Sequence, residues 1–236
     1  IPIDRLCHVM EAGRHDGRTI DGAVLCHPNS PTGQACSADD VARLAKATRR
    51  RGLWLVIDEA FADYCPERSV LPHAASWPHV VILRSMTKFY ALPGLRVGYA
   101  VATRITARRL QQQLPPWSVS AMGQVAALTA VNDAAHARKS LRFMARERDR
   151  LRALLVALPG CVVMPTHANY FLVELPRGWH APDITENLRR RGLLIRDCSS
   201  VPGANVRSIR LAVRTVQDND RLIQALSQLL QKGVSS

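Results

Sequence analysis

Residues 85–99 read SMTKFYALPGLRVGY, and this stretch decides how the rest of the chain is interpreted. It places Lys88 among polar and cationic residues in a protein whose basic residues are mostly arginine. A lysine in a desolvated or cationic site can lose its proton and form a Schiff base with a carbonyl compound, whereas an arginine stays charged. Lys88 is therefore a candidate for covalent attachment of a cofactor.

Three neighbours of this lysine suit a phosphate group. Ser85 and Thr87 offer hydroxyl donors, and Arg96 offers a guanidinium whose planar donor fork matches phosphate oxygens. The alternative for Arg96 is an ordinary salt bridge at the edge of a strand. The Pro93-Gly94 turn argues against this alternative, because a constrained turn fixes where the arginine points.

Short apolar runs alternate with helical patterns in the first half of the chain, and this alternation favours an α/β layered fold. Strands are predicted at 22–27, 53–58, 80–84 and 96–102. The run LWLVID at 53–58 is mostly apolar, as expected of a parallel strand covered on both faces. Ser37, which shortly precedes two aspartates, is predicted to cap a helix between the first two strands.

Polar residues follow three of these strands. The turn PNSPTG occupies 28–33, the pair Asp58-Glu59 ends the second strand, and the group around Lys88 follows the third. Ligands of open α/β sheets gather at the carboxyl ends of the strands. One pocket could therefore draw on all three groups.

The chemistry of the first two groups leaves alternatives open. Asp58 could pair with a protonated pyridine nitrogen, because a carboxylate at the end of an apolar strand needs a cationic partner. Capping of the next helix or turn is an equal alternative for Asp58. Asn29 or Ser30 could donate a hydrogen bond to a ring oxygen of a cofactor, or their turn could simply be rigid.

The second half of the chain predicts a smaller α+β domain. A long charged helix at 132–158 is stopped by Pro159-Gly160 and joins the two parts. Behind it are predicted, in order, a strand at 170–175, a helix at 183–191, strands at 193–196 and 208–213, and a helix at 217–231. The expected domains are residues 1–132 and residues 133–236, with residues 133–158 as the connecting helix.

Three residues of this second half stand out as ligand candidates. Arg210 lies in the apolar strand IRLAV, Arg196 follows two apolar residues in the same manner, and Asn169 precedes the strand at 170–175. A guanidinium at such a place either faces solvent or binds an anion. On the residues alone, exposure to solvent is the favoured interpretation for both arginines.

The composition of the 236 residues bears on class and partners. With 47% apolar residues the chain can bury a core, and it has neither a run of about 18 apolar residues nor an export signal, so we expect a cytoplasmic protein without a membrane partner. Six scattered cysteines suggest neither a metal site nor disulfides. The net charge of +13 could attract nucleic acid, but the arginines lie along helices without interleaved aromatic residues, and we expect no such partner.

Taken in order, the motifs PNSPTG, DEAF, SMTK and PGLRVGY resemble the large domain of fold-type I pyridoxal-phosphate (PLP) enzymes of the aspartate aminotransferase superfamily. Within it the chain resembles the threonine-phosphate decarboxylases more than the closely related histidinol-phosphate aminotransferases. The segments that favour the former are 83–96, 111–120 and 209–214. The resemblance implies an α/β, N-terminally incomplete PLP-binding large domain followed by a smaller α+β C-terminal domain.

The resemblance also implies a role for each candidate residue. Lys88 would form the Schiff base with PLP, and Asp58 would pair with its pyridine nitrogen. Further cofactor contacts would come from Ser85, Thr87, Arg96, Ser30 and Phe61, and substrate contacts from Arg210 for the carboxylate, Arg196 for the phosphate and Asn169 near the carboxylate. This reverses the interpretation of the two arginines. Ser30 departs from the asparagine usual in the family, and Phe61 stands where the aminotransferases usually have tyrosine.

The implied activity is PLP-dependent decarboxylation of L-threonine O-3-phosphate to (R)-1-aminopropan-2-yl phosphate in cobalamin biosynthesis, by a cytoplasmic homodimer. One alternative is an aminotransferase for histidinol phosphate or a related amino acid, and another is an inactive truncated fragment. The matching region begins inside the large domain, so the chain is expected to cover roughly the last two-thirds of such an enzyme. It would then lack the phosphate loop and the ring-stacking aromatic residue that the family's N-terminal segment supplies.

Overall fold

Residues 2–232 are described by the computed structural model. Residue 1 and residues 233–236, which belong to the two expected domains, lie outside the described residues. Among residues 2–232, no helix combines the length and the apolar composition that crossing a membrane requires.

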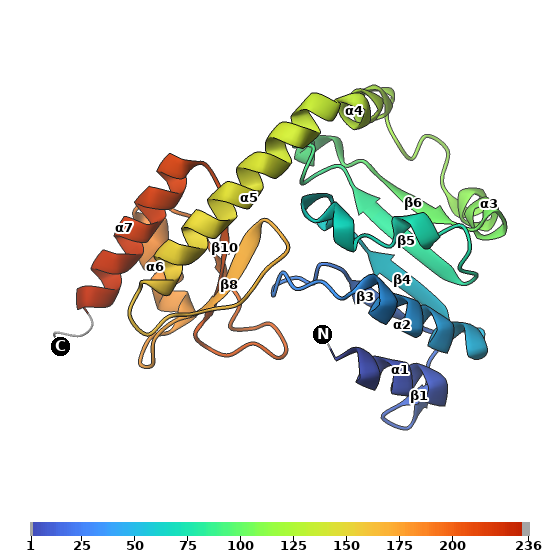
Figure 1. Cartoon of the computed structure of the whole chain (residues 1–236), viewed down its shortest axis with the longest axis horizontal. Coiled ribbons are helices and arrows are strands. Elements are labelled where there is room, and N and C mark those ends of the chain that lie inside the picture. Colours follow the sequence, from blue (N-terminus) through green and yellow to red (C-terminus); the bar gives the residue numbers. More distant parts are fainter. Residues whose placement is uncertain (1, 233–236) are drawn as a thin grey trace. The chain divides into compact units, whose positions relative to one another are not determined.

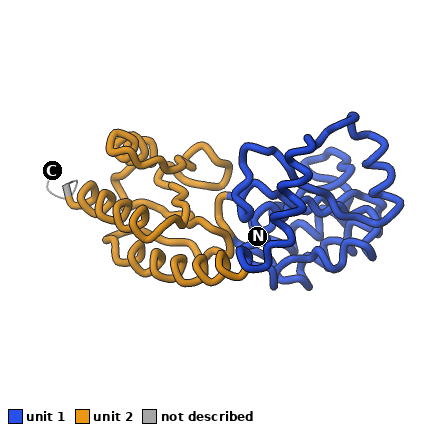
Figure 2. The backbone as a smooth tube through the Cα atoms, turned by 90° about the horizontal axis from the view of Figure 1, so that it is seen from above, with its two compact units in different colours: residues 1–30, 34–137 blue, residues 31–33, 138–236 orange. Residues whose placement is uncertain are grey.

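The chain divides into two units, which Figure 2 shows in different colours. Unit 1 comprises residues 1–30 and 34–137. Unit 2 comprises residues 31–33 and 138–236. Each unit has its own sheet and its own buried core.

Unit 1 is built on a four-stranded sheet with the order β3-β4-β5-β6 (Figure 1). The strands are β3 (Gly22–Cys26), β4 (Trp54–Asp58), β5 (Val80–Ser85) and β6 (Gly98–Ala102). The first three run parallel, and β6 pairs antiparallel with β5. The three parallel strands therefore end at the same edge of the sheet.

Helices, short 3-10 turns and one small hairpin complete unit 1. They are α1 (Ile3–Ala12), β1 (Arg14–His15), β2 (Arg18–Thr19), α2 (Ala38–Arg50), η1 (Ala62–Tyr64), η2 (Pro66–Arg68), η3 (Leu71–His73), η4 (Pro93–Leu95), α3 (Arg104–Gln113) and α4 (Ala121–Asn132), and α5 (Ala134–Val156) runs on into unit 2. The predicted cap of α2 is confirmed, because the Ser37 hydroxyl accepts a hydrogen bond of 3.0 Å from the N–H of Asp40.

The core of unit 1 joins the sheet to α1 and α2. Alternate residues of a strand point to opposite faces, so Leu25, Ile57 and Ile82 share the face that packs with Val41 and Leu44 of α2. All five side chains are buried. Two residues further along each of these strands, the same face carries a polar residue instead. A polar layer therefore closes the apolar core at the carboxyl ends of the strands.

Unit 2 contains an antiparallel sheet with the order β7-β8-β10-β9 (Figure 1). Its elements are β7 (Val162–Val163), β8 (Tyr170–Glu174), α6 (Ala181–Arg190), β9 (Arg196–Asp197), β10 (Ser208–Ala212) and α7 (Val216–Lys232), together with most of α5. Phe171 of β8, Leu151 and Leu155 of α5, and Ile184 and Leu188 of α6 are fully buried. This is the α+β arrangement predicted for the second half of the chain.

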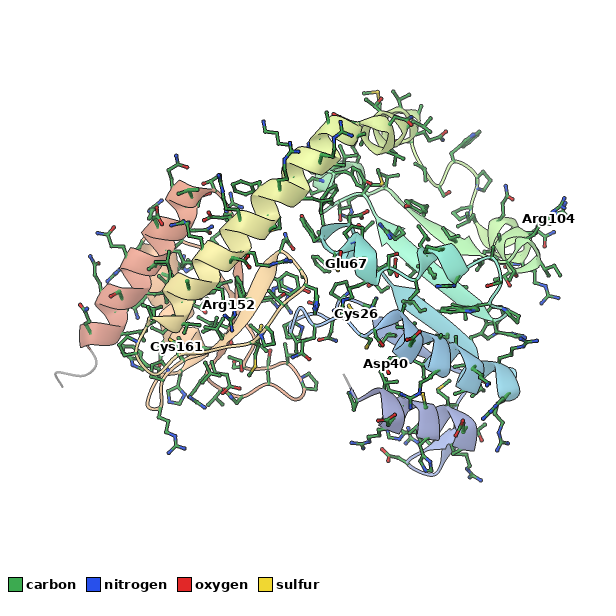
Figure 3. All side chains as sticks on the ribbon, in the orientation of Figure 1. Cys26, Asp40, Glu67, Arg104, Arg152 and Cys161 are labelled. Carbon is green, nitrogen blue, oxygen red and sulfur yellow. The ribbon has the colours of Figure 1, made fainter. Side chains whose placement is uncertain are left out.

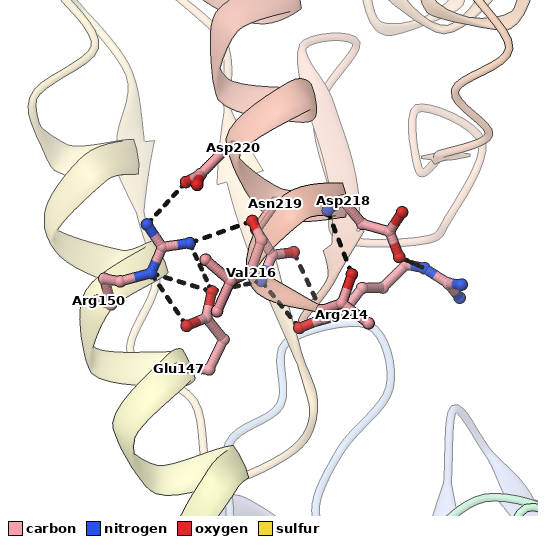
Figure 4. Close-up of polar contacts among 8 residues, drawn as sticks. Glu147, Arg150, Arg214, Val216, Asp218, Asn219 and Asp220 are labelled. Carbon is pink, nitrogen blue, oxygen red and sulfur yellow. Dashed lines mark hydrogen bonds and ion pairs between the residues drawn. The ribbon is translucent and has the colours of Figure 1, made fainter.

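A polar network ties α5 to α7 (Figure 4). Glu147, whose side chain is 1% exposed, accepts hydrogen bonds from Arg150 (2.7–3.1 Å) and from the Asn219 amide (2.8 Å). Arg150 also reaches Asp220 at 2.7 Å. Asn219 in turn accepts from the Arg214 N–H at 3.1 Å and donates to the Arg214 carbonyl at 3.0 Å, which fixes the segment between β10 and α7.

Two predicted elements have different boundaries in the structure. The strand predicted at 96–102 begins at Gly98, because Arg96 ends η4 in a left-handed backbone conformation with φ 51°. The helix predicted at 132–158 is interrupted at Asp133, whose backbone leaves the helical region. The Asp133 carboxylate accepts the N–H of His136 at 2.8 Å and so starts α5 as a separate helix.

The strand predicted at 193–196 is also shorter than expected. Only Arg196–Asp197 pairs with β10. The N–H of Leu193 donates instead to the Leu188 carbonyl at 2.9 Å, so the chain is still completing the C-terminal turn of α6 at that point.

Candidate cofactor site

The carboxyl ends of β3, β4 and β5 lie side by side. Cys26 of β3 pairs in register with Asp58 of β4, and Asp58 pairs in register with Leu83 of β5. The N–H of Glu59 donates to the Leu83 carbonyl at 2.9 Å, so the pairing continues one residue past β4. The polar groups that follow these strands are thereby brought to one edge of the sheet.

Asp58 is half-buried at this edge. Its Oδ1 accepts a hydrogen bond of 3.0 Å from the N–H of Ala60, so one carboxylate oxygen holds the turn after β4. Turn capping was the alternative to pairing with a pyridine nitrogen. A carboxylate has two acceptor oxygens, and the geometry is compatible with both uses at once.

Lys88 lies in the loop after β5 and is exposed. Its Nζ stands 5.8 Å from the centroid of the Phe61 ring, within the range of a cation–π contact. The Lys88 carbonyl accepts the N–H of Ala91 at 3.1 Å, which closes a turn around the lysine. The structure therefore brings Lys88 close to Phe61, which is three residues after Asp58 in the chain.

Ser85 and Thr87 form a pair of hydroxyls. Their side-chain oxygens are 2.7 Å apart, and the N–H of Thr87 donates to Ser85 Oγ at 3.3 Å. Arg96 is exposed, and its guanidinium donates to the Pro93 carbonyl at 3.0 Å. Ser85 pairs in register with Gly98 of β6. Arg96 is therefore only two residues along the chain from the residue that lies opposite Ser85.

Ser30 is exposed in the turn after β3. The N–H of Asn29 donates to the Gln34 carbonyl at 2.8 Å and holds the start of this turn. Burial raises the pKa of the Cys26 thiol, while a hydrogen bond from the Ser30 backbone lowers it. That hydrogen bond places Ser30 beside Cys26, and hence close to Asp58.

Three residues of this edge were not anticipated as site components. Cys26, labelled in Figure 3, lies opposite Asp58 on the same face of the sheet, and its raised pKa keeps the thiol neutral. Glu59 and Arg84 join in a buried ion pair at 2.9 Å. In the sequence, Glu59 and Arg84 could have been noticed as charged residues that lie directly after or within an apolar strand.

In unit 2 the two predicted substrate arginines are neighbours. Arg210 of β10 pairs in register with Arg196 of β9, so their side chains share one face of the sheet. The Arg210 guanidinium lies 4.7 Å from the centroid of the Tyr170 ring. Two like charges side by side repel each other, and a bound anion would relieve this repulsion.

Asn169 stands at the start of β8 in the same unit. Its backbone carbonyl accepts the N–H of Val213, directly after β10, at 2.8 Å. Its side-chain oxygen Oδ1 is buried and has no hydrogen-bond partner among the described residues. A buried oxygen without a donor is costly, and a hydrogen-bond donor on a ligand would remove this cost.

The residues of unit 1 fit PLP by their chemistry. The cofactor has an aldehyde, a phosphate and a pyridine nitrogen. The edge of the sheet offers an amine in Lys88, the hydroxyl pair of Ser85 and Thr87, and a carboxylate in Asp58. Each group of the cofactor thus has a matching donor or acceptor on β4, β5 or the loop that follows β5.

Comparison with known proteins places these motifs in a family. The model of the aminotransferase class I and II family matches residues 6–226. Threonine-phosphate decarboxylase from Salmonella typhimurium is 36% identical over 213 residues, which are 89% of this chain and 58% of that protein. Histidinol-phosphate aminotransferase from Methanococcus maripaludis (strain C6) is 29% identical over 208 residues, 88% of this chain and 55% of that protein.

Solved structures give the same assignment. Histidinol-phosphate aminotransferase from Sinorhizobium meliloti, crystallised in complex with pyridoxal-5'-phosphate, has a TM-score of 0.80 at 25% identity, and the match covers 90% of this chain and 58% of that one. The chain thus spans little more than half the length of these relatives. Since the family model extends over most of its residues, the chain belongs to the aminotransferase class I and II family, whose fold-type I members use PLP as cofactor.

Proposed function

We propose that this chain belongs to an enzyme that decarboxylates L-threonine O-3-phosphate to (R)-1-aminopropan-2-yl phosphate in cobalamin biosynthesis. The observation that carries the proposal is the 36% identity to the Salmonella decarboxylase, against 28–31% to the histidinol-phosphate aminotransferases among the similar proteins. The chain spans 58% of that decarboxylase, so the activity, substrate and partners of the whole protein are all part of the proposal. In this proposal unit 1 is the C-terminal part of the PLP-binding domain, unit 2 is the small domain, and the protein is cytoplasmic.

The pair of arginines in unit 2 supports a substrate with two anionic groups. Threonine phosphate carries two such groups, a carboxylate and a phosphate. Arg210 and Arg196 lie opposite each other on neighbouring strands, so they could hold two anionic groups of one small molecule. We assign Arg210 to the carboxylate and Arg196 to the phosphate, with Asn169 near the carboxylate.

The residues of unit 1 have the roles that the cofactor requires. When bound, PLP supplies an electron sink for the pair of electrons left when a bond to the substrate Cα breaks. Lys88 provides the amine that attaches the cofactor, and Asp58 keeps a proton on the pyridine nitrogen. Ser85, Thr87 and Arg96 hold the phosphate, while Ser30 and Phe61 contact the ring.

Orientation of the substrate then selects the bond that breaks. If the carboxylate is held perpendicular to the cofactor ring, the Cα–carboxylate bond would break and carbon dioxide would leave. The electron pair of that bond would be left at Cα, where PLP would act as its sink, and a proton delivered to Cα would give the amine product. Lys88 carries the amine that could deliver this proton.

Transamination is the second candidate function. It is favoured by the histidinol-phosphate aminotransferases among the similar proteins and structures. In that reaction the Cα–H bond takes the perpendicular position, and Lys88 moves the proton. The two functions differ in which bond to the substrate Cα stands perpendicular to the cofactor ring rather than in the cofactor-binding residues.

We also propose that the enzyme is a homodimer. Exposed apolar residues gather on and just before α4: Trp117 (94% exposed), Met122, Val125, Leu128 and Val131. A second copy of the chain would cover such a surface. Sedimentation should give the mass of a dimer, and Leu128→Asp should shift it towards the mass of a monomer.

The test of function begins with the cofactor. The purified chain should acquire a visible absorption band with PLP, and borohydride should change this band and fix the cofactor to the protein. Lys88→Ala should abolish both effects. Lys46→Ala, which alters an exposed lysine of the same unit, should leave both unchanged.

Substrate assays then separate the candidates. Decarboxylation predicts carbon dioxide from O-phosphothreonine. Release of no carbon dioxide, together with transamination between histidinol phosphate and 2-oxoglutarate, would establish the second function instead. A colourless chain that takes up no PLP would indicate the inactive fragment.

A further inference from the structure

A buried layer of polar side chains closes the core of unit 1. Two residues past the last apolar core position of β3, β4 and β5, the chain places His27, Glu59 and Arg84 on the core face. The side chains of His27 and Glu59 are fully buried, and that of Arg84 is 8% exposed. Charged groups at such depth require partners, and the partners are found on the segment after β4.

Arg84 stands between two carboxylates. Its Nη1 donates to Glu59 Oε2 at 2.9 Å and to Ser69 Oγ at 3.2 Å, and its Nη2 pairs with Asp63. Burial opposes the charge of Arg84, but the two carboxylates outweigh this effect and its pKa is raised. The Arg84 guanidinium on β5 therefore binds both Glu59, which directly follows β4, and Asp63 in the η1 turn.

Glu59 is the centre of the layer. Its Oε1 accepts the N–H of Val70 at 2.7 Å, and its Oε2 accepts the Ser69 hydroxyl at 2.6 Å. His27 Nδ1 lies 3.9 Å from the same carboxylate, yet burial lowers the pKa of this histidine. Its Nε2 contacts the Cys36 carbonyl at 3.2 Å, where it must be the donor, whereas Nδ1 is buried and has no hydrogen-bond partner among the described residues.

Each charged member of the layer adjoins a residue of the proposed cofactor site. Successive residues of an extended strand point to opposite faces, so Asp58 and Ser85 turn away from the layer while their chain neighbours enter it. Phe61 directly precedes η1, the turn that the guanidinium anchors through Asp63, and its ring faces Lys88. The layer thus fixes the backbone next to Asp58, Phe61 and Ser85, three residues that are assigned to the cofactor.

We propose that Arg84, Glu59 and Asp63 form a clamp that positions Asp58, Phe61 and the Ser85–Lys88 loop for the cofactor. The three clamp residues are positioning residues, since none of them is assigned a contact with PLP. The proposal rests on the cofactor-binding function of this edge. It differs from a purely structural role, which would lower the stability of the chain and leave the cofactor affinity of the folded protein unchanged.

The experiment compares two conservative variants of the clamp. Asp63→Asn keeps the shape of the side chain and removes its charge, and Arg84→Lys keeps the charge and removes the planar fork. Both variants are titrated with PLP at a temperature at which the chain remains folded. We expect the dissociation constant to rise by roughly 10-fold or more, the size of effect seen when residues that support ligand-holding groups are altered. The pH midpoint of the visible band of the bound cofactor should also shift.

Arg150→Lys is the matched control. Arg150 also holds two carboxylates, Glu147 and Asp220, but it lies in unit 2 and is assigned no contact with cofactor or substrate. This variant should lose stability and keep the PLP affinity and the pH midpoint of the unaltered chain. Equal loss of affinity in Arg150→Lys and in the clamp variants would overturn the proposal, as would clamp variants that bind PLP within two-fold of the unaltered chain.

Hydrogen exchange tests the clamp without any cofactor. In the apo chain, Asp63→Asn should speed amide exchange in residues 60–64 and 85–91, and Arg150→Lys should not. If the unaltered chain takes up no PLP, the proposed function fails and this measurement alone decides about the clamp. Unchanged exchange in both segments would then overturn it.

Discussion

Two arginines of this protein each hold a pair of carboxylates, one in each unit. Arg84 is 8% exposed, and its partners Glu59 and Asp63 are 0% and 11% exposed. Arg150 is 35% exposed and joins the buried Glu147 to Asp220, which is 54% exposed. The same chemistry therefore operates inside the protein in unit 1 and at its surface in unit 2.

This difference suggests a rule: the burial of an ion pair determines how much stability is lost when one partner is removed. Water screens charges at the surface and solvates whichever partner is left when a pair is broken. A buried charge has no such substitute, so loss of its partner leaves the full cost of desolvation. The buried cluster is also the one that adjoins the cofactor-facing residues, whereas the surface cluster joins two helices.

Replacement of the buried arginine should have the largest effect on stability. Arg84→Met leaves two carboxylates in the interior without their cation. Glu59 keeps its hydrogen bonds from Val70 and Ser69, but no positive charge then balances either group, and we expect the free energy of unfolding to fall by about 3–5 kcal/mol. Urea unfolding measures this loss. A fall of less than about 1 kcal/mol would mean that water reaches the cluster and solvates the two carboxylates.

The same replacement at the surface should cost less. In Arg150→Met, Asp220 is solvated, and Glu147 keeps its hydrogen bond of 2.8 Å from Asn219. We therefore expect a loss of about 1–2 kcal/mol by the same measurement. A loss equal to that of Arg84→Met would contradict the dependence on depth.

The contrast between the clusters also shows what the sequence could and could not predict. The four strands of the main sheet of unit 1, the Ser37 cap and the family itself were predicted from the sequence. The cap and the family are confirmed, and the strands lie where they were predicted except that β6 begins at Gly98. These features depend on apolar periodicity, turn residues and motif order, which lie within short windows of the chain. The roles of Lys88 and Asp58 also came from local motifs and remain predictions.

The buried cluster could not be found in this way. Arg84 and Glu59 are 25 residues apart in the chain, and their contact depends on the register between β4 and β5. Register is a tertiary property that a single strand does not specify. The register that pairs Arg196 with Arg210 could not be predicted either, because β9 is only two residues long.

Acid should affect the two clusters with opposite sign. Hydrogen bonds from Arg150 hold the pKa of Glu147 below 4.5, so its contribution to stability is present above that pH and is lost as the pH falls through the lowered value. Burial raises the pKa of Asp63 above 3.8 although Arg84 opposes it. The folded state then holds the Asp63 proton more tightly than the unfolded state, so this contribution is present at low pH and is lost as the pH rises.

Urea unfolding between about pH 3 and pH 7 tests these signs. The stability difference between the unaltered chain and Glu147→Gln should shrink as the pH falls. The difference between the unaltered chain and Asp63→Asn should shrink as the pH rises. Parallel slopes for the two variants would show that burial does not dominate at Asp63.

An ion pair at the surface should have the smallest effect, even where the pKa shift is large. Hydrogen bonds from Arg189 and Arg190 lower the pKa of Glu186 to about 2 on α6. These side chains are all exposed, so solvent replaces the interaction when it is removed, and the side chains regain conformational freedom. Glu186→Gln should therefore leave the urea midpoint at pH 7 unchanged. A loss as large as that of Arg150→Met would mean that the exposed cluster is ordered enough to contribute to stability, and depth alone would then no longer explain the difference between Arg84 and Arg150.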